Sequence, residues 1–157
     1  KNNLSEPYRI ESNPVSRVGG RNYALATQSP SSLVGKGNVT GQTIAASQLS
    51  KHAASRLVAQ THIRISADIT FNESDNGSIF VGFNGGGSWI YRELGIPMVN
   101  GTKHISFSMQ LKRQLTSADK LIFSAENTNA TISVANVMLE TGDIEHDSVP
   151  APEDYFK

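Results

Sequence analysis

The 157-residue sequence has no cysteine, a single tryptophan and few charged side chains. Without cysteine there can be no disulfide bond and no thiolate metal site, so packing and hydrogen bonds must hold the fold. No run of about 18 apolar residues occurs, and no membrane-spanning segment is predicted. The 14 Lys+Arg balance the 14 Asp+Glu. Phosphate binding needs an excess of clustered cations, so neither nucleic acid nor a membrane surface is expected as a partner.

The residues that are present indicate one β-rich domain. The chain is 38% hydrophobic and long enough to bury roughly two thirds of the surface that its unfolded form exposes. Residues 1–20 lack periodicity and carry Pro and Gly, so they are predicted to be a leader or linker, with Tyr8, Ile10 and Val15 able to dock on a neighbour. The sequence begins without Met, and we expect it to be part of a longer polypeptide. The domain itself is expected over residues 21–157.

Alternation of apolar and polar residues is clearest over residues 61–71, where every second side chain is apolar. Further strands are predicted at 22–26, 78–83, 88–94, 103–112, 121–125 and 131–139. In the last of these the alternation slips around 136–138, which predicts a β-bulge. Residues 29–32 and 35–38 have the composition of loops. An Ala-rich stretch between Ser47 and Gln60 repeats at helical spacing and predicts one short helix.

Seven or eight antiparallel strands, each with one apolar face, bury those faces best as two packed sheets. The predicted fold class is therefore all-β, an antiparallel β-sandwich with one short helix. The absence of a Cys, Trp, Cys pattern argues against a true immunoglobulin domain. Periodicity alone leaves open whether the strand order is that of a jelly roll or is immunoglobulin-like.

No pattern in the sequence predicts catalysis. There is no Gly-X-Ser-X-Gly motif, and the four histidines lack metal-ligand spacing. Carboxylates between Glu140 and Asp147 are of a kind that Ca²⁺ accepts, but the Asp/Asn spacing of calcium loops is missing. We therefore predict no enzyme, and no metal or other cofactor.

The segment from Phe83 to Tyr91 reads Phe-Asn-Gly-Gly-Gly-Ser-Trp-Ile-Tyr and contains the only tryptophan. It predicts a hairpin whose loop is Asn84 to Ser88. On the second strand, Trp89 and Tyr91 project to one face and Ile90 to the other. Two interpretations remain open at this stage. The aromatic side chains either belong to the core or form a surface on which a sugar ring stacks, since sugar C–H groups meet the face of an aromatic ring favourably.

Motifs in three parts of the chain resemble a known family. The last predicted strand, which includes Ile132, ends in Leu139-Glu140-Thr141-Gly142. The tail that follows contains Pro150-Ala151-Pro152-Glu153-Asp154. This resembles the hydrophobic-Glu-X-Gly step and the Asp-Trp-X-Pro-Ala-Pro-Glu-Asp tail of jelly-roll carbohydrate-binding modules in phage tail proteins. Gly20-Arg21-Asn22 resembles the Gly-Arg-Asn start of that family. The region from Leu57 to Ile69 resembles its Leu-X-Gly-Lys to Ser-X-Asp-Ile strand.

The resemblance runs from about residue 19 to 154 and departs from the pattern at three positions. Ser148 stands at the usual Trp of the tail, and Ala59 and Gln60 stand at the usual Gly and Lys. The family is carried by baseplate, distal-tail and accessory tail proteins of phages that infect Gram-positive bacteria. The resemblance implies a jelly roll that binds saccharide at the host cell surface, without chemistry, as part of the virion tail. The shared motifs carry no ligand residues.

We therefore predict a glycan-binding face on residue types alone. Trp89 and Tyr91 are the predicted stacking groups, and Asn84, Arg92 and His104 are the predicted hydrogen-bonding groups. The expected partners are host cell-surface polysaccharide and other tail or baseplate proteins. The alternative is a structural baseplate module that joins tail proteins and binds no glycan.

Overall fold

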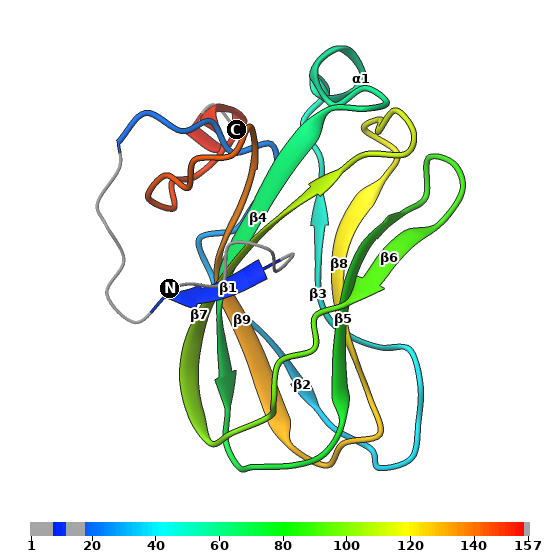
Figure 1. Ribbon diagram of the computed structural model, residues 1–157, viewed down its shortest axis with the longest axis vertical. Helices are drawn as coiled ribbons and strands as arrows, with labels where there is room; N and C mark the ends of the chain where they lie inside the picture. Colours follow the sequence, from blue (N-terminus) through cyan, green and yellow to red (C-terminus); the bar gives the residue numbers. More distant parts are fainter. Residues whose placement is uncertain (1–7, 12–17, 156–157) are drawn as a thin grey trace.

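The computed structural model describes residues 8–11 and 18–155, and these form two antiparallel β-sheets packed face to face (Figure 1). The five-stranded sheet has the order β1-β7-β4-β9-β2, and the four-stranded sheet has the order β3-β8-β5-β6. The strands are β1 (Tyr8–Glu11), β2 (Ser31–Val34), β3 (Gln42–Gln48), β4 (His62–Phe71), β5 (Ser78–Asn84), β6 (Ile90–Glu93), β7 (Gly101–Gln110), β8 (Lys120–Glu126) and β9 (Thr131–Thr141). The helical elements are α1 (Ala53–Arg56) and a 3₁₀ turn, η1 (Pro152–Tyr155).

The strand order is that of a jelly roll. From β2 to β9 the chain passes from one sheet to the other at every connection except the β5–β6 hairpin. Strands β2, β9, β4 and β7 thus lie side by side in one layer, and β3, β8, β5 and β6 in the other, as in double-sheet jelly rolls. The predicted antiparallel β-sandwich with one short helix is confirmed.

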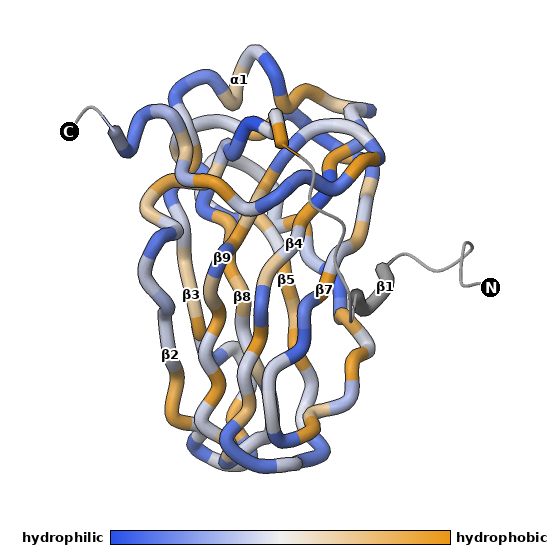
Figure 2. The backbone as a smooth tube through the Cα atoms, turned by 90° about the vertical axis from the view of Figure 1, so that its left-hand side faces the viewer, coloured by the Kyte–Doolittle hydropathy of each residue, from blue (hydrophilic) through white to orange (hydrophobic). Residues whose placement is uncertain are grey.

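The core lies between the two sheets and follows the alternation in the sequence. Every second side chain of β4 is buried, and Phe71, Phe83, Phe107 and Phe123 from both sheets are at most 1% exposed. Hydrophobic and hydrophilic residues alternate along the strands in Figure 2. Because a fully buried side chain of this size contributes about 1.5–3 kcal/mol, packing can stabilise this fold without disulfide bonds.

Strand β9 carries the predicted bulge. Ser66 of β4 pairs with Met138 whereas Asp68 pairs with Ala135, so β9 has one extra residue at this point. Asn136 lies in this bulge and has a φ of 55°, a left-handed conformation that Asn tolerates better than most residues. Its side-chain amide donates to the Asp68 carboxylate over 2.8 Å. Beyond the bulge the inward-facing positions of β9 change parity, which explains why the alternation slips.

Within the predicted domain, residues 21–157, two strands escape the sequence pattern. β2 falls in a region expected to be mostly loop; it is an edge strand paired with β9, and its side chains are largely exposed, so it shows no alternation. In β3 the register shifts between Thr43 and Ala45, and Ile44 and Ala45 are both buried, which breaks the period of two.

Two other predictions need correction. The expected strand at 22–26 is wrong, because Ala24 forms only an isolated bridge to Leu49 and Ala26 turns to a φ of 57°. The predicted helix shrinks to the single turn α1, since Ser47 and Gln48 belong to β3. None of the helices in the described part of the chain is long and apolar enough to cross a membrane.

Part of the predicted leader adds a strand to the sandwich. β1 pairs with β7, with Tyr8 opposite Phe107 and Ile10 opposite Ile105. It extends the five-stranded sheet beyond β7. Val15 lies outside the described residues.

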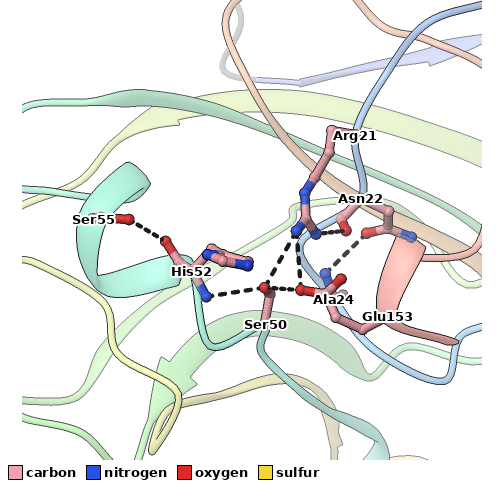
Figure 3. Close-up of polar contacts among 7 residues, drawn as sticks. All are labelled: Arg21, Asn22, Ala24, Ser50, His52, Ser55 and Glu153. Carbon is pink, nitrogen blue, oxygen red and sulfur yellow. Dashed lines mark hydrogen bonds and ion pairs between the residues drawn. The ribbon is translucent and has the colours of Figure 1, made fainter. Parts of the chain in front are cut away.

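The two motif regions near the ends of the sequence meet at one end of the sandwich (Figure 3). The Arg21 guanidinium pairs with the Glu153 carboxylate over 3.0 Å, and the Ser50 hydroxyl donates to the same carboxylate. The hydrogen bond from Arg21, with a smaller contribution from Ser50, lowers the pKa of Glu153 to about 2. Glu153 is therefore ionised at neutral pH. We call the Arg21–Glu153 pair the terminal clasp.

Asn22, next to the clasp, is completely buried. Its side-chain NH₂ donates to the carbonyls of Val137 (2.8 Å) and Val149 (2.9 Å). Its Oδ1 accepts from the backbone N–H groups of Ala24 (3.0 Å) and Leu139 (2.9 Å). One side chain thus joins β9 to the C-terminal segment that follows it.

Replacing Asn22 with alanine should destabilise the fold strongly. Asn22→Ala leaves one buried carbonyl, one partly buried carbonyl and two buried N–H groups without this partner, and we expect a loss of about 2–4 kcal/mol in the free energy of unfolding. The melting temperature should fall by roughly 4–16 °C. Thermal unfolding of Asn22→Ala and of the exposed control Asn38→Ala measures this, and equal melting temperatures would contradict it.

Candidate functional site

The β5–β6 hairpin places Trp89 and Tyr91 on the outer face of the four-stranded sheet. Trp89 is 42% exposed and Tyr91 is 56% exposed, so the core interpretation is wrong for both. Their rings stack on each other, with centroids 5.3 Å apart and planes 19° apart. Ile90, between them, is buried on the inner face, as the alternation predicts. We call Trp89 and Tyr91 the aromatic pair.

A glycine on the neighbouring strand makes room for the aromatic pair. Gly82 lies opposite Tyr91 in the β5–β6 register. A Cβ at Gly82 would lie 2.1 Å from the Ile90 carbonyl oxygen and 2.8 Å from the Tyr91 Cβ, so no larger residue fits without moving β6. On the other side of Tyr91 the Phe80 ring lies 6.3 Å away, tilted by 55°. The aromatic surface therefore consists of three rings, and Phe80 is the member that the sequence reasoning missed.

The three glycines before Trp89 let the hairpin loop lie directly against a buried ion pair. Gly86 N–H donates to an Asp119 carboxylate oxygen over 2.9 Å, and a Cβ at Gly86 would lie 2.5 Å from the other. A Cβ at Gly87 would lie 2.9 Å from the Arg113 guanidinium. Arg113 Nε donates to the Ser88 carbonyl over 2.8 Å, next to Trp89. Gly85 has a φ of 124°, which disfavours any other residue there.

Asp119 is the centre of this anchor. It is completely buried, and both oxygens accept from the Arg113 guanidinium, at 2.7 and 3.0 Å. Thr116 N–H donates to it as well, over 3.0 Å. Burial by itself raises the pKa of Asp119, but the hydrogen bonds from Arg113, Thr116 and Gly86 outweigh burial and the net pKa is lowered. The loop that carries Trp89 is thus fixed by an ionised, fully bonded carboxylate. We call Arg113 and Asp119 the loop anchor.

A groove of about 660 Å³ opens beside the aromatic pair, between the free edge of β6 and the end of β7. Its volume is within the range of ligand-binding clefts. Nine residues line it, and we call it the edge groove: Ser88, Trp89, Ile90, Tyr91, Arg92, Glu93, Met109, Gln110 and Lys112. Polar groups of five kinds, a carboxylate, an amide, an ammonium, a guanidinium and a hydroxyl, therefore line the same groove as two aromatic rings.

Of the predicted hydrogen-bonding residues, Arg92 reaches this groove and Asn84 lies nearby. Arg92 points to the inner face, where its guanidinium lies 5.3 Å from the centroid of the buried Phe107 ring. It closes the edge of the core as well as lining the groove. Asn84 is exposed at the end of β5, on the outer face of the four-stranded sheet, and is not among the lining residues.

His104 lies on the other sheet, so the expectation that it shares a face with Trp89 is wrong. It is part of β7, and its ring bridges two carboxylates, Asp68 (Nδ1, 2.7 Å) and Glu145 (Nε2, 2.5 Å). The hydrogen bond from Glu145, followed by that from Asp68, raises the pKa of His104 to about 9 against the opposing effect of burial. A protonated His104 thus holds the C-terminal segment onto the outer face of the five-stranded sheet.

Two of the carboxylates considered for calcium, Glu140 and Glu145, are engaged in similar pairs. Glu140 accepts from the backbone N–H of His146 (3.0 Å) and pairs with its ring over 2.5 Å, while Glu145 pairs with His104. Within residues 8–11 and 18–155, no three His, Asp or Glu side chains are grouped as metal ligands would be. Arg64 adds a bond to the Asp143 carbonyl over 3.0 Å. These groups fasten residues 143–146 to the sheet.

Comparison with known proteins bears on the fold. No protein-family model and no curated protein matches the sequence. Among solved structures, the BppUct-A-L tripod from the baseplate of bacteriophage Tuc2009 matches with a TM-score of 0.55 and 12% identity, over 87% of this chain and 60% of that one. The chain thus spans less than two thirds of the tripod chain.

Two carbohydrate-binding structures match less well. The CBM22-1–GH10 modules of Clostridium thermocellum xylanase 10B, complexed with xylohexaose, give a TM-score of 0.45 at 10% identity, over 82% of this chain and 29% of that one. The N-terminal cellulose-binding domain of Cellulomonas fimi β-1,4-glucanase C gives 0.42 at 9% identity, over 83% and 100%. At 12% identity, the match to the baseplate tripod shows a shared fold alone, and the jelly roll implied by the sequence motifs agrees with it.

Removing the carboxylate of the loop anchor should loosen the loop that carries Trp89. Asp119→Ala leaves Arg113 and two backbone N–H groups without their acceptor, and we expect a loss of about 2–4 kcal/mol in the free energy of unfolding. Chemical denaturation measures the loss, and fluorescence anisotropy of Trp89 reports the loop. The exposed Glu73→Ala serves as control. Unchanged anisotropy in Asp119→Ala would show that the anchor does not hold Trp89.

The pairing of His104 should make stability depend on pH at the alkaline end. The pKa of His104 is about 9 in the folded protein, against 6.5 for an unperturbed histidine in the unfolded chain. Its contribution to the free energy of unfolding is therefore complete below about pH 6.5 and is lost as the pH rises through 9. Thermal melts of the wild type and of His104→Gln between pH 6 and 10 measure this. The difference in melting temperature should shrink as the pH rises. A difference that stays constant would contradict the pairing.

Proposed function

We propose that the chain is a non-catalytic carbohydrate-binding module of a phage tail or baseplate protein, which helps to attach the virion to host cell-wall polysaccharide. The fold alone does not lead to this conclusion, because jelly rolls serve many functions. One observation carries it: a stacked and exposed Trp–Tyr pair, on a loop fixed by a buried ion pair, borders a groove lined with polar groups.

The chemistry of the groove suits a sugar. The C–H groups of a pyranose ring carry partial positive charge and pack against the negative face of an indole or phenol ring. Its hydroxyl groups need both donors and acceptors. Glu93 offers acceptors and Lys112 offers donors. The side-chain NH₂ of Gln110 already donates to Gln60, so Gln110 adds an acceptor through its Oε1. The aromatic side chains have few rotatable bonds and the loop anchor restrains them further, so little conformational entropy is lost on binding.

Binding by one such site is expected to be weak, because the site is open and its polar groups are few. Many copies on one particle would raise the overall affinity by roughly 10²- to 10⁴-fold through effective concentration. The proposed location is accordingly the tail or baseplate of the virion, next to other tail proteins at the host surface.

The two candidate functions differ in what the aromatic pair contacts. In the alternative, a structural module that joins baseplate proteins, the exposed rings of Trp89 and Tyr91 would be covered by another protein chain rather than by sugar. The exposed aromatic surface suits either partner, whereas the mixed donors and acceptors in the edge groove favour the glycan.

Substitution of Trp89 tests the proposal. Polysaccharide released from the walls of a panel of Gram-positive bacteria is titrated into the protein while Trp89 fluorescence is followed, and calorimetry compares the variants. We expect a fluorescence change in the wild type and roughly tenfold weaker binding for Trp89→Ala, since a stacking tryptophan contributes about 1–2 kcal/mol. Tyr155→Ala, which removes another exposed aromatic side chain far from the groove, should bind like the wild type.

Folding of each variant is checked by its melting temperature. If no polysaccharide in the panel changes the fluorescence of Trp89, or if Trp89→Ala binds as tightly as the wild type, the glycan-binding function is wrong. If a purified tail protein, and no polysaccharide, changes the Trp89 fluorescence to a saturating value when titrated into the protein, the structural alternative is supported.

A further inference from the structure

Strand β6 pairs through its main chain on one side. Leu94 N–H donates to the carbonyl of Ile79 over 2.9 Å, which fixes the residue pairs that are hydrogen-bonded between β5 and β6. In an antiparallel pair, hydrogen-bonded and non-hydrogen-bonded residues alternate. Arg92 therefore belongs to a hydrogen-bonded pair with β5, whereas Tyr91 and Glu93 belong to non-hydrogen-bonded pairs. Their N–H and C=O groups point away from β5, out of the edge of the sheet.

The edge groove runs along these outward-facing main-chain groups. Its lining includes Ile90 and Arg92, whose side chains point inward, and also Tyr91 and Glu93, whose side chains point outward. Residues from both faces of one strand can line a single groove only if the groove follows the strand edge. The opposite wall comes from the end of β7 and the residues after it, including Gln110.

We infer that the main-chain N–H and C=O groups of Tyr91 and Glu93 bind the hydroxyl groups of a linear, neutral polysaccharide that lies along the edge of β6. This inference rests on the proposed glycan-binding function and names the groups that would determine its specificity. The two residues are about 6.8 Å apart along the strand, so a ligand that meets both extends over more than one sugar unit.

The composition of the groove favours a neutral glycan over an extended peptide. A peptide strand added to β6 would meet at most four main-chain groups on this four-residue strand. It would also leave unused the polar side chains of Gln110 and Lys112 on the opposite wall. A sugar chain can use the main-chain groups, both walls and the aromatic pair together. Charges of both signs line the groove, Glu93 against Arg92 and Lys112, so no strongly charged polymer is selected.

A proline at position 93 tests the main-chain contribution. Glu93→Pro removes the outward N–H together with the side chain, and edge strands accept proline where the N–H faces away from the sheet. Glu93→Ala removes the same carboxylate and keeps the N–H. Ser32→Pro is the matched proline control on β2, the far edge of the five-stranded sheet. There, Gly35 N–H donates to the Ala130 carbonyl, so that Ser32 N–H also faces outward.

The probe is an array of short linear oligosaccharides of neutral hexose, pentose and N-acetylhexosamine units. We expect Glu93→Pro to bind the oligosaccharides retained by the wild type roughly three- to tenfold more weakly than Glu93→Ala does. Ser32→Pro should bind like the wild type. In the unaltered protein, the backbone amide NMR signals of Tyr91 and Glu93 should shift on saturation, which tests the inference even if the proline variant unfolds.

Different failures have different meanings. If Trp89→Ala loses binding while Glu93→Pro matches Glu93→Ala and the two amide signals stay in place, the main-chain inference is wrong and the proposed function stands. If the wild type retains no oligosaccharide or wall polysaccharide, both are wrong. If Glu93→Pro changes the sedimentation of the glycan-free protein, the edge of β6 pairs with another polypeptide chain, and the inference is overturned.

Discussion

The structure depends on one constraint: each sheet has an apolar face that must be kept from water. Packing the two apolar faces together leaves two outer faces, and these differ in what covers them. The C-terminal segment crosses the outer face of the five-stranded sheet and is fastened there by His104 and Arg64. In the four-stranded sheet, Trp89 and Tyr91 remain exposed on the outer face. The proposed site lies on this second face because its aromatic side chains are uncovered there.

An exposed tryptophan is useful for recognition only if it is held in place, and here backbone geometry and charge do so together. Gly86 and Gly87 lack the Cβ atoms that would keep the loop away from Asp119 and Arg113. The buried carboxylate then satisfies the loop N–H, and the guanidinium satisfies the carbonyl before Trp89. The run of glycines is therefore explained by close approach to a charged anchor rather than by flexibility. The same hairpin presents its outer strand edge to the groove.

The sequence predicted what depends on periodicity. The alternation in β4, the bulge at Asn136 and the placement of Trp89 and Tyr91 on one face, opposite Ile90, all follow from a side-chain repeat of two. The repeat left open which of these two faces is buried. β2 and β3 were missed because one is exposed on both faces and the other contains a register shift. The position of His104 on its strand was correctly polar, but which sheet a strand joins depends on long-range pairing that local sequence does not encode. For the same reason the partnership of Asp119 with Gly86, and the presence of Gln110 and Glu93 in one groove, gave no local signal.

The terminal clasp has a mechanical consequence. Because Arg21 and Glu153 are in contact, tension applied to the polypeptide between β1 and Arg21 and after Glu153 pulls the two sides of this ion pair directly apart. The load then reaches the buried amide of Asn22 and the last strand before it reaches the hairpin that carries the indole. Under such tension the clasp would be strained first, and the β5–β6 hairpin would keep its shape until the clasp gave way.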